Sequence, residues 1–377
     1  MTENTLCFCA VTGNATDPLT ARAHPEPPHV YRSAFQRDRD RVIHARAFRR
    51  LAGKTQVFTH PDSDHFRSRL THTIEVAQIA RTVANALGLN EDLTETLALV
   101  HDIGHPPFGH AGEQALNTQL QPYGLGFDHN LHALRIVEYF EQRYVEFRGL
   151  NLTSAVREGI IKHSRDYSSA DHPELAEYLL DRRPPLEAQI IDVADEIAYL
   201  TADIDDGIEA GILTLAEICR HVSLFADFYR QLELRHPGSP PKLLFHEALK
   251  SMMNALVNDL IVTTRQQAAR AGVHSLEDIR ALARRLVAFS PAIEERRREA
   301  KQYLAQHLYH AENLERDHQL AEEIISGLFA HWMKHPEQLP CGHEIQIATE
   351  GAPRVVADYI AGMTDNYIAD QWRRVHE

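Results

Sequence analysis

Apolar residues recur at helical spacing along most of this 377-residue chain. Positions three or four apart fall on one face of an α-helix, so a repeating apolar series predicts an amphipathic helix. Two such series are Ile74, Ala77, Ala80, Val83 and Leu87, and Ile190, Val193, Ala194 and Ile197. No convincing alternation of apolar and polar residues interrupts this pattern between residues 31 and 233. The pattern therefore predicts an all-α fold.

Proline and glycine positions divide the chain into three parts. Residues 1–28 lack periodicity, which predicts a mobile N-terminal arm. The segment 235–241 contains three prolines and one glycine, which prevent a helix from continuing. We therefore expect a helical core over residues 29–234 and a C-terminal helical lobe over residues 235–377.

Two helices of the expected lobe have recognisable sequence signals. Ser290 followed by Pro291 is typical of the N-cap and first turn of a helix, and the residues up to Ala305 suit an exposed helix. The segment from Pro353 to Trp372 has an amphipathic pattern, which predicts a second helix.

Net charge and cysteine usage narrow the class of protein. The formal net charge of −14 at pH 7 makes extended nucleic-acid binding unexpected. A small anionic ligand stays compatible with it, because a few basic residues in one cleft set the local potential. The four cysteines lack the paired spacing of a disulfide framework or a structural zinc site. With a polar start and no apolar run of bilayer length, we expect a cytoplasmic protein without a membrane span.

Metal-ligand residue types gather in the segment His101 to Glu113. His101 and Asp102 end an apolar run, where two unpaired polar groups would cost a few kcal/mol to bury. A divalent ion would satisfy both groups. With one more histidine and one more aspartate, the site would have two imidazoles and two carboxylates, which suit an ion used in hydrolysis. His72 and Asp195, on other expected helices, are the further candidate ligands. A histidine alone on a helix, such as His72, is more often a surface or hydrogen-bonded residue.

The order of these residues resembles the HD superfamily of metal-dependent phosphohydrolases, and the surrounding motifs resemble its deoxyguanosinetriphosphate triphosphohydrolase branch. The matching motifs are residues 38–41, 47–51, 54–58, 69–72, 101–113, 127–130 and 195–199, followed by the ending 354–365. The resemblance thus frames nearly the whole chain, although residues 243–347 contain no motif that we can match.

The resemblance implies an all-α HD-domain core that hydrolyses a deoxynucleoside triphosphate (dNTP) at its α-phosphorus, releasing the deoxynucleoside and triphosphate. It implies one divalent ion per subunit. The implied metal ligands are His72, His101, Asp102 and Asp195. We expect Mn²⁺ or Mg²⁺, while Fe²⁺, Co²⁺ and Ni²⁺ also suit these ligands.

Three positions match residues that the family uses in catalysis. His110 is expected to transfer a proton, since imidazole titrates near neutral pH. Glu113 follows three residues later and is expected to orient it. His129 is the third position, although some branches carry glycine there. The ordinary alternative for His110 and Glu113 is a helix-capping pair.

Other positions match substrate contacts of the family. Arg69, Lys162 and His105 match contacts to the phosphates, where an arginine can grip with two hydrogen bonds and a lysine acts as a point charge. An arginine or lysine on a helix is otherwise usually solvated.

The sugar is expected to lie against a second set of residues. Tyr199 and Asp203 follow Asp195 at four-residue intervals on one predicted helical face, and a ring stacked on the deoxyribose would exclude a 2′ hydroxyl. Gln56 matches a contact to the 3′ hydroxyl. Asn130 matches a substrate contact, with a helix N-cap as its alternative, and Tyr199 has the alternative role of a core aromatic.

Two other functions stay open at this point. One is a different HD-type nucleotide phosphatase or phosphodiesterase, and the other is a non-catalytic regulator that binds dNTPs or DNA ends. The resemblance further implies a homo-oligomer, a hexamer or tetramer built from dimers, and allows an activating dNTP at a second site. The sequence Asp365-Asn366-Tyr367 departs from the more usual Asp-Arg-Tyr, which puts any contact of that arginine in doubt.

Overall fold

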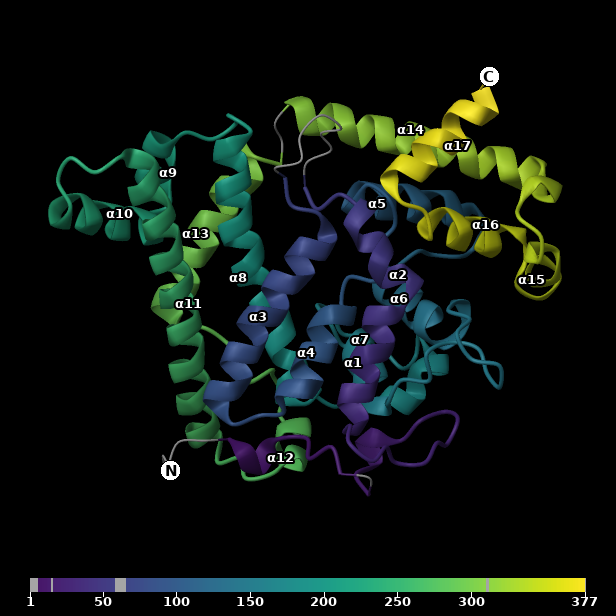
Figure 1. Cartoon of the computed structure of the whole chain (residues 1–377), viewed down its shortest axis with the longest axis horizontal. Coiled ribbons are helices and arrows are strands. Elements are labelled where there is room, and N and C mark those ends of the chain that lie inside the picture. The colour runs from purple at the N-terminus through teal and green to yellow at the C-terminus, as the bar shows by residue number, and fades with distance from the viewer. Residues whose placement is uncertain (1–5, 15, 58–65, 310–311, 377) are drawn as a thin grey trace. The chain divides into compact units, whose positions relative to one another are not determined.

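A computed structural model describes residues 6–14, 16–57, 66–309 and 312–376. Its α-helices are α1 (Ala34–His44), α2 (Arg46–Arg50), α3 (Arg69–Leu87), α4 (Glu91–Val100), α5 (Gly109–Leu120), α6 (His129–Arg135), α7 (Ser154–Ile161), α8 (Leu186–Glu209), α9 (Leu215–His221), α10 (Ser223–Arg235), α11 (Pro241–Ala271), α12 (Leu276–Arg280), α13 (Pro291–His307), α14 (Glu312–Lys334), α15 (His343–Glu350), α16 (Ala352–Ala361) and α17 (Asp365–His376). Figure 1 shows these helices along the chain.

The all-α prediction is confirmed. The described residues contain no β-strand, and their β contacts are isolated bridges such as the one between Thr55 and Ser68. Short helical turns, including a π-helical turn at Ile136–Phe140, connect several α-helices. No helix in the described part of the chain is long and apolar enough to cross a membrane.

The chain folds as two compact units. Unit 1 comprises residues 1–39, 74–98 and 153–311, and unit 2 comprises residues 40–73, 99–152 and 312–377. In unit 2, α14 packs against α5, α16 and α17. Their apolar faces form a buried cluster that includes Leu116 and Ile325.

Unit 1 is built around α8, α11 and α13, with α9 and α10 packed on them. Residues 6–11, which belong to the segment predicted to be a mobile arm, pack within this unit. Cys9 and Val11 are buried, and the Val11 amide donates to the Glu187 carboxylate on α8 over 2.9 Å. These contacts fix the described start of the chain to unit 1.

The predicted helix ends are confirmed at two places. α10 ends at Arg235 and α11 begins at Pro241, as the proline-rich break predicts. Ser290 caps α13, its hydroxyl accepting a hydrogen bond from the Ile293 amide. The first apolar series lies on α3, although its member Ile74 is 54% exposed.

The predicted amphipathic helix from Pro353 to Trp372 is two helices. α16 ends at Ala361 and α17 begins at Asp365. Thr364 directly precedes the second helix, and its carbonyl accepts from the Ile368 amide. The apolar pattern continued through the break, so periodicity alone did not show it.

Candidate functional site

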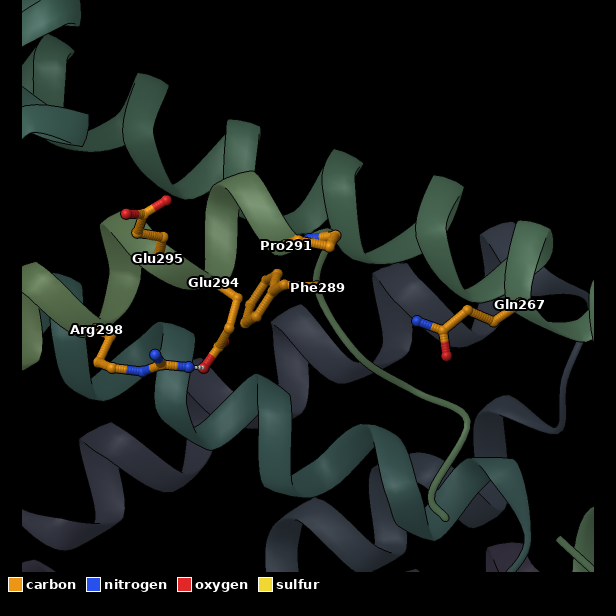
Figure 2. Close-up of a pocket in the computed structure, with 6 residues that line it drawn as sticks. All are labelled: Gln267, Phe289, Pro291, Glu294, Glu295 and Arg298. Carbon is orange, nitrogen blue, oxygen red and sulfur yellow. Dashed lines mark hydrogen bonds and ion pairs between the residues drawn. The ribbon is translucent and has the colours of Figure 1, made fainter. Parts of the chain in front are cut away.

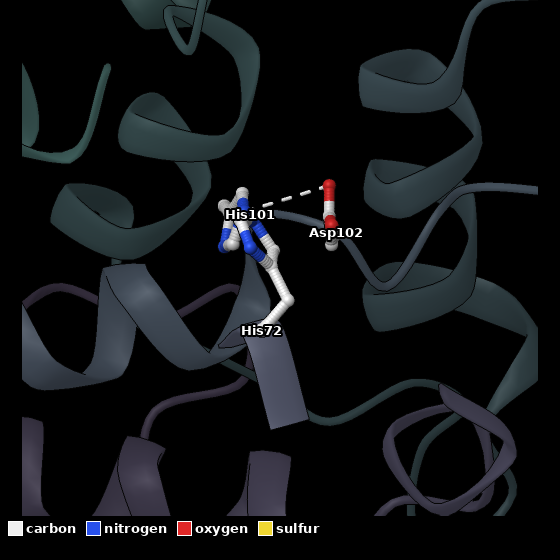
Figure 3. Close-up of side chains that lie close together, drawn as sticks. All are labelled: His72, His101 and Asp102. Atoms are coloured by element: carbon white, nitrogen blue, oxygen red, sulfur yellow. Dashed lines mark ion pairs between the residues drawn. The ribbon is translucent and has the colours of Figure 1, made fainter. Parts of the chain in front are cut away.

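Two histidines and an aspartate of unit 2 come together where α3 begins and α4 ends. His72 lies in the first turn of α3, and His101 and Asp102 directly follow Val100, the last residue of α4. One ligand-type atom of each lies within 4.8 Å of the others, and all three residues are buried (Figure 3). The structure therefore brings together three of the four metal ligands predicted from the sequence.

Asp102 is surrounded by positively charged and imidazole groups. Its Oδ2 accepts a hydrogen bond from Arg69 Nη1 over 2.8 Å, and its Oδ1 lies 3.1 Å from His105 Nδ1. Burial alone would raise the pKa of Asp102, but His101, His105 and Arg69 outweigh burial and hold this pKa well below its usual value. Asp102 is therefore a carboxylate at neutral pH, as a metal ligand must be.

His105 is buried in the same place, in stacked contact with His129. The ring centroids are 4.1 Å apart, with an angle of 25° between the ring planes. Burial and the nearby Arg69 lower the pKa of His105 well below its usual value, so its ring is neutral at neutral pH. Among the described residues, none makes a hydrogen bond with His105 Nε2.

The turn between α4 and α5 needs residues without bulk or with unusual backbone angles. A Cβ atom on Gly104 would lie 1.9 Å from the carbonyl oxygen of His129, so only glycine fits. Phe108 and Gly109 have φ values of 62° and 57°, in the left-handed region. A Cβ on Gly109 would meet Arg69 Nη2 at 2.8 Å. The turn thus lets α5 start close to Arg69 and to the metal-ligand pair.

α5 and α6 place His110, Glu113 and His129 beside one another. Glu113 accepts from the backbone amide of His129 over 3.0 Å, and its Oε1 lies 2.9 Å from His129 Nδ1. His110 Nδ1 is 3.7 Å from Glu113, and the side chain of His110 is 69% exposed. The structure gives Glu113 a closer contact with His129 than with His110, the residue it was predicted to orient.

Hydrogen bonds set the charge of Glu113. Burial alone would raise the pKa of Glu113, but the nearby His110 ring and the hydrogen bond with His129 lower it well below its usual value. An ionised Glu113 holds the imidazole of His129 in one orientation through this contact.

Buried donors near the metal ligands have unfilled hydrogen-bonding capacity. Nε and Nη2 of Arg69 are buried without a hydrogen-bond partner in the described part of the chain. The same holds for both amide atoms of Gln56. Buried polar groups are almost always hydrogen-bonded in native proteins, so such groups require an explanation. An anionic ligand with several oxygen acceptors would satisfy the two Arg69 nitrogens and Gln56 Nε2.

Asn130 is buried in the first turn of α6. The alternative prediction, that Asn130 caps this helix, is wrong. Asp128 is the N-cap, and its carboxylate accepts from the amides of Asn130 and Leu131 over 2.8 and 3.0 Å. The side chain of Asn130 is thus not used for capping, and its predicted substrate contact stays a prediction.

Asp195, Tyr199 and Asp203 lie on α8, in unit 1. Their four-residue spacing places them along one side of this helix, as predicted. Tyr309, which the sequence did not suggest, donates a hydrogen bond from its hydroxyl to the Asp203 carboxylate. Burial and the Asp203 carboxylate raise the pKa of Tyr309. The roles of these α8 residues toward metal and sugar stay predictions.

Lys162 follows α7 in unit 1 and has three hydrogen-bond acceptors. Its Nζ donates to Glu158 Oε1 and to the carbonyl oxygens of Leu179 and Arg182, each over 2.8 Å. Burial lowers the pKa of Lys162, although Glu158 opposes this. An ammonium group has three donors, so a phosphate would have to displace one of these acceptors. Its predicted phosphate contact stays a prediction.

A surface pocket of about 550 Å³ lies elsewhere in unit 1. Figure 2 shows its lining residues, which are Gln267, Phe289, Pro291, Glu294, Glu295 and Arg298. Arg298 and Glu294 pair over 3.4 Å. None of the predicted site residues lines this pocket, so it is separate from the candidate chemistry.

The donor set of His72, His101 and Asp102 fits a divalent transition ion. Two imidazoles and one carboxylate are ligands that such ions accept, and three protein ligands leave coordination positions for water or substrate. The residues present therefore fit the metal that the sequence predicts.

Comparisons with known proteins agree with this site. Residues 69–200 match the model of the HD domain, and residues 287–374 match that of the phosphohydrolase-associated domain. A deoxyguanosinetriphosphate triphosphohydrolase-like protein of Thiobacillus denitrificans is 47% identical over 356 residues, covering 94% of both chains. Proteins with the same name from an Azoarcus species and from Geobacter sulfurreducens are 47% and 45% identical, covering 94% of this chain and 93% and 92% of their own.

Proposed function

The chain belongs to the deoxyguanosinetriphosphate triphosphohydrolase-like family of HD-domain proteins, and from this we propose that it is a metal-dependent dNTP triphosphohydrolase. The proposed reaction cleaves a dNTP at its α-phosphorus to give the deoxynucleoside and triphosphate. The substrate is dGTP or several dNTPs. The relatives' names and the matched HD domain support the reaction class, and the geometry of unit 2 supports the assignment of residues.

One observation carries the proposal. A buried group of metal ligands, His72, His101 and Asp102, lies beside buried donors that have no partner among the described residues. Arg69 links the two sets, since one of its nitrogens binds Asp102 and two others have no partner in the described chain. A phosphate chain contacting a metal ion is a ligand that would complete both sets.

When bound by His72, His101 and Asp102, with Asp195 as the predicted fourth ligand, a divalent ion supplies charge that polarises a phosphate oxygen and activates water. Arg69 then holds a phosphate oxygen with Nε and Nη2 while its Nη1 stays on Asp102. His105 stays the further phosphate contact proposed from the sequence, although a neutral ring whose Nδ1–H faces Asp102 has no second N–H to donate.

Proton transfer is proposed for the His110, Glu113 and His129 group. The exposed His110 exchanges protons with solvent and with the attacking water or the leaving 5′ oxygen. Glu113 stabilises the protonated form of its histidine neighbours through the contacts described above. A fixed carboxylate beside an imidazole is the arrangement that general acid–base catalysis needs.

The remaining features of the proposal rest on the family and on sequence. Gln56, Tyr199 and Asp203 contact the sugar, Asn130 and Lys162 contact the substrate, and the ring of Tyr199 excludes ribonucleotides. We further propose Mn²⁺ or Mg²⁺ as the ion, a cytoplasmic location and a homo-oligomer built from dimers. The division into an arm, a core over residues 29–234 and a lobe over residues 235–377 is also a proposal.

Removing a ligand tests the metal assignment. In His101→Ala and Asp102→Ala, bound metal and dNTP turnover should disappear together, since each variant loses one of three clustered donors. The measurement is metal content by mass spectrometry alongside hydrolysis rates. His331→Ala, at a histidine on α14, is the control. Turnover by a variant that binds no metal would sink the metal-dependent mechanism.

A further inference from the structure

The first residue of α17, Asp365, contacts two segments of the candidate active site. Asp365 Oδ2 accepts hydrogen bonds from the amide and the hydroxyl of Thr55, over 2.6 and 2.5 Å. Its Oδ1 accepts from the amide of Phe108 over 3.0 Å. One carboxylate therefore joins the segment before Gln56 to the start of α5.

Lys54 makes a second link between the same segments. Its buried Nζ donates to the carbonyl oxygens of His105 and Ala361, over 2.5 and 2.9 Å. Nearby, Arg50 Nη1 donates to the carbonyl oxygen of Gly362 over 2.8 Å. The loop over residues 361–365 is thus tied by side chains to residues 50–55 and to the turn after His101 and Asp102.

The positions held by these bonds are the ones that aim functional side chains. Thr55 directly precedes Gln56, whose buried amide has no partner among the described residues. Phe108 is the N-cap of α5 and has a left-handed backbone that residues with a side chain rarely adopt. α5 carries His110 and Glu113. A bond to the Phe108 amide therefore stabilises the conformation that sets the direction of α5.

We propose that Asp365 is a positioning residue of the active site, which fixes Gln56 and α5 around the substrate through Thr55 and Phe108. This inference rests on the proposed dNTP hydrolysis and assigns a role to the C-terminal motif. Asp365 does not touch the reacting atoms. It acts by holding the backbone at Thr55 and at Phe108 in fixed positions. Lys54 makes further hydrogen bonds between the same parts of the chain.

The variant Asp365→Asn tests this role. A carboxylate offers two accepting oxygens to three donors, whereas asparagine offers one accepting oxygen, so at least one bond is lost. We expect kcat to fall by about 100-fold, as for a misplaced catalytic group, with a smaller change in KM and full metal content. Asp370→Asn, on the exposed side of α17, makes the same chemical change as a control. Wild-type kcat in folded Asp365→Asn would overturn the proposal.

Thr55→Val provides a second variant in case Asp365→Asn does not fold. Valine has nearly the same shape as threonine and removes one donor to Asp365. We expect Thr55→Val to lower kcat less than Asp365→Asn does. The double variant should lose less kcat than the product of the two single losses, because both changes act on the same set of hydrogen bonds. Independent effects of the two changes, or an unchanged kcat in Thr55→Val and its double variant, would contradict a shared positioning role.

Amide hydrogen exchange separates failure of this inference from failure of the proposed reaction. In Asp365→Asn, residues 54–56 and 105–112 should exchange faster than in the wild type and in Asp370→Asn. An inactive wild-type protein would refute the proposed reaction, and faster exchange would still show that Asp365 holds these segments. Unchanged exchange in an active protein would overturn the inference while leaving the reaction in place.

Discussion

At the scale of single residues, one side chain binds a neighbour at the candidate site and has donors for a second group. Arg69 uses Nη1 to bind Asp102, and its Nε and Nη2 have no hydrogen-bond partner in the described chain. A planar guanidinium can hold a carboxylate and a phosphate at the same time, whereas an ammonium is a single point of charge. The identity of this cation should therefore matter as well as its charge.

We expect Arg69→Lys to lower kcat/KM for the substrate by about 10- to 100-fold, the value of one or two charge-assisted hydrogen bonds. The metal should remain bound, since no ligand is changed. Steady-state kinetics and metal analysis are the measurements, with Arg81→Lys on α3 as the control because Arg81 lies at the surface. Equal kinetics in Arg69→Lys and the wild type would remove Arg69 from the phosphate site.

Glu113 provides the second test at this scale. In Glu113→Gln the carboxylate that contacts His129 becomes a neutral amide, so a protonated imidazole loses its stabilising charge. We expect kcat to fall by about 100-fold, the lower range for a proton-transfer group, with unchanged metal content. Rates measured across pH 6–9, with Glu344→Gln on α15 as the control, check this. A wild-type pH profile would assign Glu113 a structural role.

The sequence predicted the members of this site better than their contacts. Residue types and order indicated His72, His101 and Asp102, and the structure clusters them. The same reasoning paired Glu113 with His110, because both lie on one helix, but His129 on α6 makes the closer contact. Such contacts depend on how two helices pack against each other, and the spacing of residues within one helix does not determine that packing.

At the scale of elements, the turn from residue 101 to residue 109 determines whether the site forms. Gly104 packs against the backbone of α6, where a Cβ would lie 1.9 Å from the His129 carbonyl oxygen and 2.6 Å from the Ala133 amide nitrogen. Backbone atoms cannot rotate away as a flexible side chain can. A larger residue here must therefore separate the turn from α6.

We expect Gly104→Ala to lower the free energy of unfolding by roughly 2–4 kcal/mol, because it overpacks a site bounded by backbone. Gly124→Ala is the matched control. Gly124 has a positive φ, of 67°, which Gly104 does not, but nothing in the described part of the chain lies within 4 Å of an added Cβ, so only backbone strain of about 1 kcal/mol applies. Urea unfolding measures both. Equal losses in the two variants would contradict the backbone clash.

The sequence predicted some helix ends correctly and missed another. The proline-rich segment 235–241 and Ser290 were recognisable because caps and prolines act locally. The break between α16 and α17 was missed because the apolar period continues through residues 362–364. Its cause is tertiary, since Asp365 and Ala361 bond to other segments of unit 2.

At the scale of the whole molecule, the all-α fold followed from periodicity, but its two units did not. Unit 1 and unit 2 each combine three separated stretches of sequence, and three of the five dividing positions fall within α1, α3 and α4. A pattern read along the chain marks breaks between helices. It cannot show which distant helices share a core.

Acid stability should depend on a buried pair in unit 2. His132 Nδ1 lies 3.2 Å from Asp358, which also pairs with Arg135. Burial lowers the pKa of His132 against the opposing effect of Asp358. Burial alone would raise the pKa of Asp358, but His132 and Arg135 outweigh it and lower this pKa. The folded protein therefore resists protonation at both groups.

As pH falls below about 6.5, the unfolded chain protonates His132 before the folded chain does, so stability decreases with falling pH. One such proton contributes up to about 1.4 kcal/mol per pH unit, and Asp358 extends the loss below about pH 4. Urea unfolding between pH 5 and 7.5 gives the free energy of unfolding as a function of pH. This free energy should change less with pH in His132→Gln than in the wild type. His318→Gln, at an exposed position on α14, is the control. If the free energy of unfolding of His132→Gln depended on pH as in the wild type, this pair would not be a cause of the acid sensitivity.

The most direct test of the account is an analysis of reaction products. The purified protein is incubated with each dNTP and NTP, singly and mixed, with Mn²⁺ or Mg²⁺, and the products are resolved by ion-exchange chromatography. We predict metal-dependent release of deoxynucleoside and intact triphosphate from at least one dNTP, with ribonucleotides left uncleaved. Release of a monophosphate or a diphosphate would indicate a different HD hydrolase. No product in any mixture would contradict a catalytic role and favour a nucleotide-binding regulator.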